Sequence, residues 1–214
     1  MSWHAKPQYA YARSSTEAYE NCLEIWTVLG NRGWTLNAVC GLLGNMGGES
    51  GYNPWRWEGD VVLASTDPDI DRQPISGQNN HGYGLVQFTP AGKYVHSPYA
   101  QAYPTFSPNY SDISGTPEDG ESQMLFLHEH NDYYPSSQYN WTYQEYISKT
   151  DNTDNMTEAW FYNYERGVYN PQSMAVRKAD ASYWFTALPS TPPSPTPTKK
   201  KGMPLWMMTI PYRN

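Results

Sequence analysis

The fold prediction starts from residues 31 to 54, which read NRGWTLNAVCGLLGNMGGESGYNP. Thr35 is a favourable N-cap residue, and apolar side chains recur after it at helical spacing as far as Met46. This pattern predicts an amphipathic helix whose apolar face is buried. Glycines favour helix ends, so we expect Gly47-Gly48 to stop the helix and Glu49 to follow it directly.

Two glycines inside this expected helix need a separate explanation. Gly41 and Gly44 each cost about 1 kcal/mol relative to alanine in a helix interior. The cost is understandable if another backbone or a ligand approaches the helix closely at these positions. We therefore expect tight contacts on this side of the helix.

Glu49 is the main candidate for catalysis. It stands at the C-terminal end of the expected helix, where the negative end of the helix dipole disfavours a charged carboxylate. Apolar rings around it would let the carboxyl group keep its proton near neutral pH and donate that proton to a glycosidic oxygen. On the residues alone, however, the favoured interpretation is a solvated surface side chain, because that is what an acid in a turn usually is.

A second segment, HGYGLVQFTPAGKYV from His81 to Val95, holds most of the candidates for substrate binding. Its glycines would let the backbone come close to a ligand, and its glutamine could donate and accept hydrogen bonds along a sugar. The same segment can be read as a glycine-bearing strand that is followed by a helix start. The substrate-binding candidates are Tyr52, Tyr83, Gly84, Gln87 and Phe88.

The remaining pattern defines the fold class. Residues 51 to 90 are rich in Gly, Pro, Asn and Asp, which predicts loops and a small irregular hairpin. Further helices are expected over residues 14–30, from 117 onward, and over 142–147, 155–165 and 173–187. The predicted class is α+β, mainly α, with a small β or loop lobe that forms one wall of a groove.

A change in composition near Leu188 indicates the domain organisation. Residues 1–188 are expected to form one domain, and residues 189–202, PSTPPSPTPTKKKG, an extended and semi-rigid linker. Residues 203–214 are apolar but too few for a domain. They could be a docking peptide, a membrane-surface contact or a disordered tail, and the last is favoured.

Composition limits the classes of partner. A net charge of −7 and a sequence pI of about 5.1 argue against a nucleic-acid partner, which calls for a basic face. The first fifteen residues contain no apolar run, so we expect no secretory signal there, and no stretch approaches the ~20 apolar residues of a membrane span. The triplet His128-Glu129-His130 looks ligand-like, but alternate residues of a helix point to different sides. We expect no metal and no cofactor.

The two cysteines, Cys22 and Cys40, fall on the apolar stripes of expected helices. Buried thiols are the simpler interpretation, and a disulfide between neighbouring helices is the alternative. A cysteine amidase or endopeptidase that uses Cys40 and His81 is a rival function. A nucleophilic thiolate is stabilised at a helix N-terminus, whereas Cys40 is expected in the middle of a helix, which argues against this rival.

The two segments together resemble a known signature. The motif E-S-G-Y-N-P, followed some thirty residues later by G-Y-G-L-V-Q-F-T-P, is similar to the motif pair of goose-type lysozymes, lytic transglycosylases and phage tail lysozymes. The similarity is greater to the lysozyme domain at the tail tip of short-tailed phages. It covers roughly residues 18 to 188 and includes QEYISKT (144–150) and the corner Tyr164-Glu165-Arg166.

This resemblance implies a lysozyme-like fold and cleavage of the β-1,4 bond between N-acetylmuramic acid and N-acetylglucosamine. In these families the glutamate of the motif is the general acid, a role that falls on Glu49, and the Gly-Leu-x-Gln strand lines the cleft. The peptidoglycan glycan strand would be the substrate, and other phage tail proteins are possible partners. We expect the protein on the virion tail or released by host lysis. A peptidase domain often follows the linker in such proteins, but only the apolar tail follows it here.

The identity of the second catalytic carboxylate stays open. Inverting hydrolysis needs a base about 6.5–9.5 Å from the acid, and Glu58 and Asp60 follow Glu49 closely enough to supply it. The acids expected to be solvated are Asp67, Asp69 and Asp71. Glu165-Arg166 is expected to form a structural salt bridge beside the cleft. Without a second acid, the enzyme would be a lytic transglycosylase that releases anhydro sugars. A non-catalytic module that binds the cell wall is the alternative from another class.

Overall fold

The computed structural model describes residues 3–5, 10–56, 58, 82–95, 97–102 and 117–195, and this part of the chain is mainly helical, as predicted. Its α-helices are α1 (Thr16–Gly30), α2 (Leu36–Glu49), α3 (Gly92–Val95), α4 (Pro98–Ala102), α5 (Pro117–Glu129), α6 (Tyr143–Ser148), α7 (Thr153–Trp160) and α8 (Pro171–Ala187). A π-helical turn, η3 (Phe161–Glu165), continues α7.

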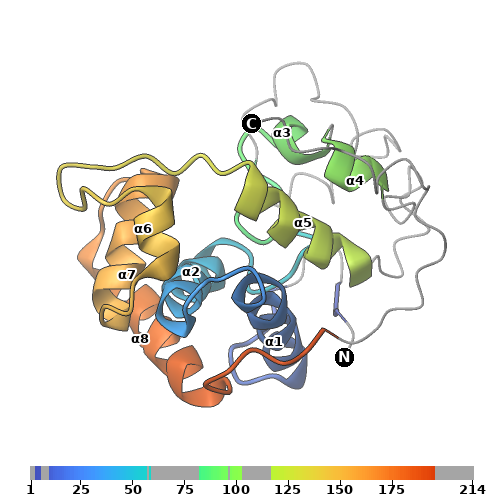
Figure 1. Ribbon diagram of the computed structural model, residues 1–214, viewed down its shortest axis with the longest axis horizontal. Helices are drawn as coiled ribbons and strands as arrows, with labels where there is room; N and C mark the ends of the chain where they lie inside the picture. Colours follow the sequence, from blue (N-terminus) through green and yellow to red (C-terminus); the bar gives the residue numbers. More distant parts are fainter. Residues whose placement is uncertain are drawn as a thin grey trace.

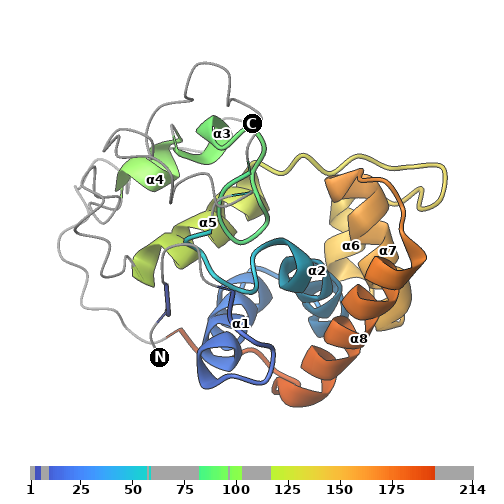
Figure 2. The ribbon, with the colours of Figure 1, turned by 180° about the vertical axis from the view of Figure 1, so that it is seen from behind.

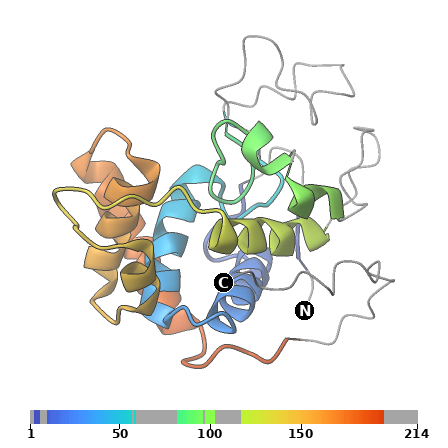
Figure 3. The ribbon, with the colours of Figure 1, turned by 45° about the horizontal axis from the view of Figure 1, so that its top comes forward.

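Helix α2 lies at the centre of the molecule. Helix α1 is on one side of it, and α7 and α8 are on the other side, where they make its most extensive contacts (Figure 1, Figure 2). Helix α5 packs on α1 and, with α3 and α4, forms a second group of helices (Figure 3). The C-terminal end of α2 therefore lies between this second group and the first group, which consists of α6, α7 and α8 (Figure 2).

Side-chain caps fix the starts of three helices, as the sequence predicts. Ser15 Oγ accepts a backbone N–H of the first turn of α1, and Thr35 Oγ1 does the same for α2, both at 3.1 Å. The capping box of α6 is complete. Thr142 Oγ1 accepts the Glu145 N–H at 3.2 Å, and the Glu145 carboxylate accepts the Thr142 N–H at 2.7 Å.

The prediction that Gly47-Gly48 stop the second helix is wrong. Helix α2 runs through Glu49, and the chain turns at Gly51, whose φ is +57°. A β-carbon on Gly47 would lie only 2.4 Å from Asp180 Oδ2 of α8. The glycine is therefore explained by close packing against α8 and not by helix termination.

The expectation of close approach at Gly41 and Gly44 is confirmed. A β-carbon on Gly41 would lie 2.7 Å from the backbone of Met156 on α7. A β-carbon on Gly44 would lie 2.4 Å from the carbonyl oxygen of Arg177 on α8. Both neighbours are backbone atoms, which cannot move aside cheaply. Helices α7 and α8 thus pack directly on the backbone of α2.

The second group of helices holds little β structure. Among the residues that the structure describes, an isolated bridge pairs Tyr83 with Phe88 through hydrogen bonds of 3.3 and 2.8 Å. Aromatic rings from α3 and α5, Tyr94 and Phe126, pack against the Phe88 side of this bridge. Residues 59–81, which hold much of the predicted hairpin, lie outside the described residues. The small β lobe therefore stays a prediction.

The chain after α8 folds back along α1. Trp26 Nε1 donates to the carbonyl of Pro189, and Asn31 Nδ2 donates to the carbonyl of Pro193, both at 2.9 Å. The first residues of the predicted linker thus pack against the domain, while the predicted tail, 203–214, lies outside the described residues. None of the helices in the described ranges combines the length and the apolar character needed to cross a lipid bilayer.

Candidate active site

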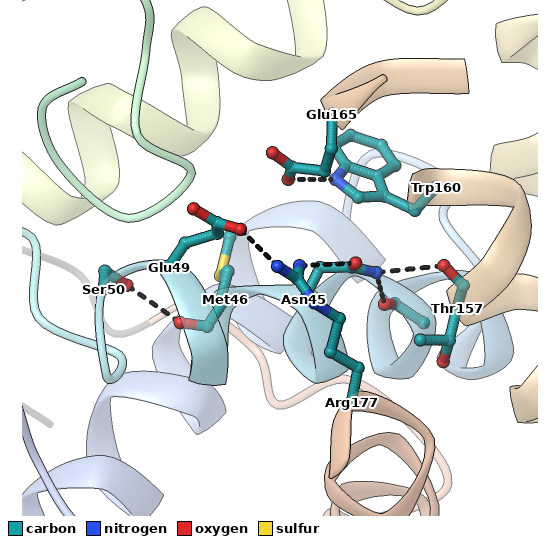
Figure 4. A network of polar contacts seen from close by, with 9 residues as sticks. Asn45, Met46, Glu49, Ser50, Thr157, Trp160, Glu165 and Arg177 are labelled. Carbon is teal, nitrogen blue, oxygen red and sulfur yellow. Dashed lines mark hydrogen bonds and ion pairs between the residues drawn. The ribbon is translucent and has the colours of Figure 1, made fainter. Parts of the chain in front are cut away.

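Glu49 is the last residue of α2, and an ion pair holds its side chain. Arg177 Nη2, from α8, donates to Glu49 Oε1 at 2.5 Å (Figure 4). The side chain of Glu49 is 25% exposed and that of Arg177 is 12% exposed, so solvent reaches the pair only in part. The carboxylate is therefore fixed in position and still accessible.

Asn45, one helical turn before Glu49, anchors the same arginine. Arg177 Nη1 donates to Asn45 Oδ1 at 2.9 Å. The amide nitrogen of Asn45 donates to the carbonyls of Gly41 at 2.9 Å and of Thr157 on α7 at 3.1 Å. Because Asn45 is fully buried and all three contacts use its side chain, α2, α7 and α8 are tied together directly beneath the carboxylate.

A second carboxyl group lies close to the first. Glu165 ends η3, the wider turn that redirects the side chains after α7. Trp160 Nε1 donates to Glu165 Oε1 at 3.2 Å. The carboxyl groups of Glu49 and Glu165 point toward one another, and the guanidinium of Arg177 lies on the same side of α2 (Figure 4). Three elements thus bring two carboxyl groups and one cation together.

The surroundings of Glu165 favour its protonated form. Burial and, after it, the negative charge of Glu49 raise the pKa of Glu165 to about 8. The positive charges of Arg177 and Arg166 and the hydrogen bond from Trp160 act in the opposite direction but do not cancel the rise. Glu165 is therefore mainly uncharged at neutral pH, while Glu49 is paired with a cation.

A pocket of about 460 Å³ opens beside Glu165. It lies between the loop that follows the isolated bridge, α5 and the end of η3. Its lining residues are Val86, Gln87, Phe88, Thr89, Lys93, Phe126, His130, Asp132, Tyr164, Glu165 and Arg166. Glu49 does not line this pocket itself, but its carboxylate faces that of Glu165, which does. The volume is in the range of pockets for small ligands.

Two predicted substrate-binding residues, Gln87 and Gly84, occupy different positions. Gln87 lines the pocket, but its Nε2 donates to the carbonyls of Arg56 at 3.0 Å and of Gly84 at 2.9 Å. Gly84 has a φ of +82°, and a β-carbon there would lie 2.3 Å from Gln123 Oε1 of α5. The close approach that the glycine permits is thus to α5. The expected contacts of both residues with a sugar stay predictions.

The predicted aromatic residues lie deeper than expected. Phe88 lines the pocket although it is only 4% exposed. Tyr83 is 2% exposed and stacks on Tyr94, with ring centroids 6.2 Å apart. Tyr52 is 1% exposed, and its hydroxyl donates to Asp180 Oδ2 at 3.1 Å. Tyr83 and Tyr52 therefore stabilise the fold, and neither is among the residues that line this pocket.

The candidates for the second carboxylate are only partly described. Glu58 is exposed, and its carboxylate accepts the N–H of Gly82 at 2.8 Å, while its own N–H donates to the Gly82 carbonyl at 2.9 Å. These bonds attach Glu58 to the start of the loop that lines the pocket. Asp60, like Asp67, Asp69 and Asp71, lies outside the described residues. The roles of Glu58 and Asp60 stay predictions.

Glu165 is the residue whose surroundings the sequence did not indicate. We expected a salt bridge with Arg166, but the partner of Glu165 is Trp160. Arg166 instead lies over the ring of Tyr134, with 5.2 Å between its Cζ and the ring centroid. Only the run of aromatic residues before Glu165 hinted at a buried acid. Arg177, likewise, carries no motif that marks it as a partner of Glu49.

The residues of the alternative functions, a cysteine amidase and a metal site, have structural roles where the structure describes them. Cys22 and Cys40 are free, buried thiols, as expected, and burial raises the pKa of Cys40. His128 Nδ1 accepts a hydrogen bond from Trp34 Nε1 at 3.1 Å, whereas His130 packs on Phe126 and faces the pocket. His81 lies outside the described residues. A buried thiol held in its neutral form is a poor nucleophile.

Comparisons with known proteins show the family of the chain. The sequence profile of a family described as phage tail lysozyme matches residues 20–188. A protein named morphogenesis protein 1, from Bacillus phage B103, is 32% identical over 179 residues, which make up 82% of this chain. The match covers 41% of that relative, so the chain spans less than half of its length.

Proposed function

Because the chain belongs to the phage tail lysozyme family, we propose that it cleaves peptidoglycan at the β-1,4 bond between N-acetylmuramic acid and N-acetylglucosamine. Glu49 is the general acid of this reaction, and the glycan strand is the substrate. No cofactor takes part. The similarity to a phage morphogenesis protein supports a place on the virion, with other tail proteins as partners.

One observation supports the proposal most strongly. The glutamate of the motif is held at the end of α2 by Arg177, which Asn45 holds in turn, and it faces a second carboxyl group that lines a pocket. Glycosidic cleavage needs a carboxyl group that is fixed to within a fraction of an ångström beside a space for the sugar. An ordinary surface acid would have neither the buried cation nor the pocket.

A general acid must hold a proton when the glycosidic oxygen arrives. In the structure Glu49 Oε1 accepts a hydrogen bond from Arg177 Nη2 at 2.5 Å, and the two side chains form an ion pair. Glu165, which faces Glu49, is a second carboxyl group that can carry this proton, because burial and the charge of Glu49 raise its pKa to about 8.

The cleavage can proceed as hydrolysis or as transglycosylation, and the two reactions differ in the group that attacks the sugar. In hydrolysis, a base such as Glu58 or Asp60 activates a water molecule, and the product contains that water. In transglycosylation, a hydroxyl group of the sugar itself attacks and leaves an anhydro end. Mass analysis of the released fragments separates the two, because the products differ by one water molecule.

The proposal is tested by the release of soluble fragments from purified peptidoglycan. Glu49→Gln keeps the size of the side chain and removes the acid, so we expect the rate to fall by about 10²–10⁴-fold. Glu158→Gln is a matched control, because Glu158 on α7 is another partly buried glutamate, pairs with Lys178 of α8 and does not line the pocket. Equal activity of the wild-type protein and Glu49→Gln would refute the assignment. Binding to the wall without any fragment release by the wild-type protein would identify a non-catalytic module.

A further inference from the structure

We propose that Glu165 is the second catalytic carboxyl group, and that Glu49 and Glu165 hold one proton between them while they face the same substrate. This inference rests on the proposed function, since it concerns the same site. It assigns a role to a residue that sequence reasoning placed in a structural salt bridge.

The geometry gives Glu165 access to the substrate. Its carboxyl group lines the pocket and points toward Glu49 (Figure 4). One oxygen, Oε1, accepts the hydrogen bond from Trp160, which fixes the orientation of the group. Among the described residues, the other oxygen, Oε2, has no hydrogen-bond partner, and the side chain lines the pocket. A bound sugar can therefore reach this oxygen.

The charges around the pair explain why it carries a single proton. Glu49 from α2 and Arg177 from α8 face Glu165, and Arg166 follows it in the chain. The other charged or titratable residues that line the pocket are Lys93, His130, Asp132 and Tyr164, and Lys93 is neutralised by its ion pair with Asp132. The guanidinium of Arg177 lies beside the two facing carboxyl groups and compensates one negative charge, whereas Arg166 is exposed and lies over the ring of Tyr134. The second charge would be buried and repelled, so one carboxyl group keeps its proton.

The position of Arg177 lets the proton move between the two groups. It pairs with Glu49 directly, and its charge also stabilises the ionised form of Glu165. When the proton passes from Glu165 to Glu49, the negative charge passes the other way and stays close to the same cation. The net charge of the site does not change. Glu49 can thus become the acid without uptake of a proton from solvent.

The reaction then balances within the pair. As the bond between the sugar C1 and the glycosidic oxygen breaks, the bonding electrons leave with that oxygen, and the proton of the pair is transferred to it. The ionised carboxylate stabilises the positive charge that develops at C1. The same carboxylate accepts the proton of the attacking group, either water or a hydroxyl of the sugar, as its oxygen bonds to C1. The pair ends the cycle with one proton.

The decisive experiment measures the pH dependence of fragment release by Glu165→Gln. Glutamine can still accept the hydrogen bond from Trp160, so the fold should be kept. We expect kcat to fall by about 100-fold or more, with KM changed by less than about threefold. The substitution removes the carboxyl group whose pKa is raised to about 8, so the alkaline limb of the pH profile should move to lower pH. Glu165→Asp should restore part of the rate.

The controls separate this inference from the proposed function. Glu158→Gln should leave both the rate and the pH profile unchanged. If Glu49→Gln is inactive while Glu165→Gln keeps its rate within about threefold and its pH profile, Glu165 is not catalytic and the proposed function stands. If Glu58→Gln or Asp60→Asn shows the effects expected for Glu165→Gln, and Glu165→Gln does not, the second carboxylate is there. If both Glu49→Gln and Glu165→Gln are fully active, the proposed function itself is wrong.

A second measurement does not depend on the folding of Glu165→Gln. Carboxyl ¹³C NMR of the wild-type protein should show one glutamate that titrates well above the others. In Glu49→Gln this glutamate should titrate at lower pH, because a repelling charge is gone. A spectrum in which no glutamate titrates above the ordinary range would overturn the shared proton.

Discussion

Arg177 holds Glu49, the last residue of α2, in its position in the candidate site. Its guanidinium contacts Asn45 Oδ1 and Glu49 Oε1 at the same time and lies 5.4 Å from the centroid of the Phe161 ring. A lysine could supply the charge but not the planar, two-sided contact. The arginine therefore fixes the position of the carboxyl group that we propose as the general acid.

The first prediction follows from this double contact. Arg177→Met should lower the rate of peptidoglycan cleavage by at least about tenfold, because Glu49 is no longer held in place. It should also lower the free energy of unfolding by about 1–3 kcal/mol, since Asn45 Oδ1 loses its partner in a buried environment. Denaturant unfolding and initial rates measure the two effects. Arg177→Lys should recover part of the rate, and a fully active Arg177→Met would contradict the positioning role.

The second prediction concerns the buried thiol of α2. Cys40→Ala should keep the rate of peptidoglycan cleavage, because Cys40 is fully buried in the core. The small cavity left by the sulfur should cost about 1–2 kcal/mol of stability. Loss of all activity in a variant that is still folded, as judged by circular dichroism, would support the alternative that the protein is a cysteine amidase.

At the scale of elements, the glycines of α2 decide how closely α7 and α8 approach. Gly44→Ala should lower the free energy of unfolding by about 1–3 kcal/mol, because the new methyl group would meet the Arg177 carbonyl and force the helices apart. The gain in helix propensity, about 1 kcal/mol, works against this loss and does not outweigh it.

Gly48→Ala is the matched control on the same helix. Its β-carbon would find its nearest neighbours, atoms of the Arg177 guanidinium, at 3.6 Å, an ordinary contact distance. We therefore expect Gly48→Ala to be neutral or slightly stabilising in denaturant unfolding. Equal destabilisation by the two substitutions would show that the approach of α8 is not what requires Gly44.

The elements whose signals are local could be predicted from the sequence. Caps at Ser15, Thr35 and Thr142 depend on neighbouring residues alone, and these helices begin as expected. The end of α2 could not be predicted, because Gly47 is required by Asp180, far away in the chain. Sequence rules predict a helix end at Gly47 and Gly48, whereas the structure continues the helix there and packs Gly47 against α8.

Only part of the candidate site could be predicted from the sequence. Glu49 stood out through its motif, but its partner Arg177 comes from a helix that begins more than a hundred residues later. Glu165 depends on a π turn, for which the sequence offers no recognised signal. Tyr52 and Tyr83 were interpreted as sugar-binding rings, yet tyrosines serve a core equally well, and the structure buries both.

At the scale of the whole molecule, the carboxyl pair couples stability to pH. The pKa of Glu165 is raised to about 8 in the folded protein from the ordinary value of 4.5, because of burial and the charge of Glu49. Between these two values the folded state holds a proton that the unfolded state has released, so this group makes folding less favourable as pH rises. The stabilising contribution is complete below the lower value and is lost as pH rises through the upper one.

The corresponding prediction compares melting temperatures across pH. The difference in melting temperature between Glu165→Gln and the wild-type protein should shift in favour of the variant as pH rises from about 4.5 to about 8. Calorimetry at several pH values measures it, with Glu158→Gln as the control. A difference that stays constant over this range would mean that Glu165 titrates normally in the folded protein.

The central claim is that this fold positions a carboxyl group to break the glycan strand of peptidoglycan. Mass spectrometry of the fragments released from purified peptidoglycan tests it most directly. The account predicts fragments that end in N-acetylmuramic acid, with either a free or an anhydro end, and their absence with Glu49→Gln. Fragments cut only within the stem peptides, on intact glycan strands, would contradict it.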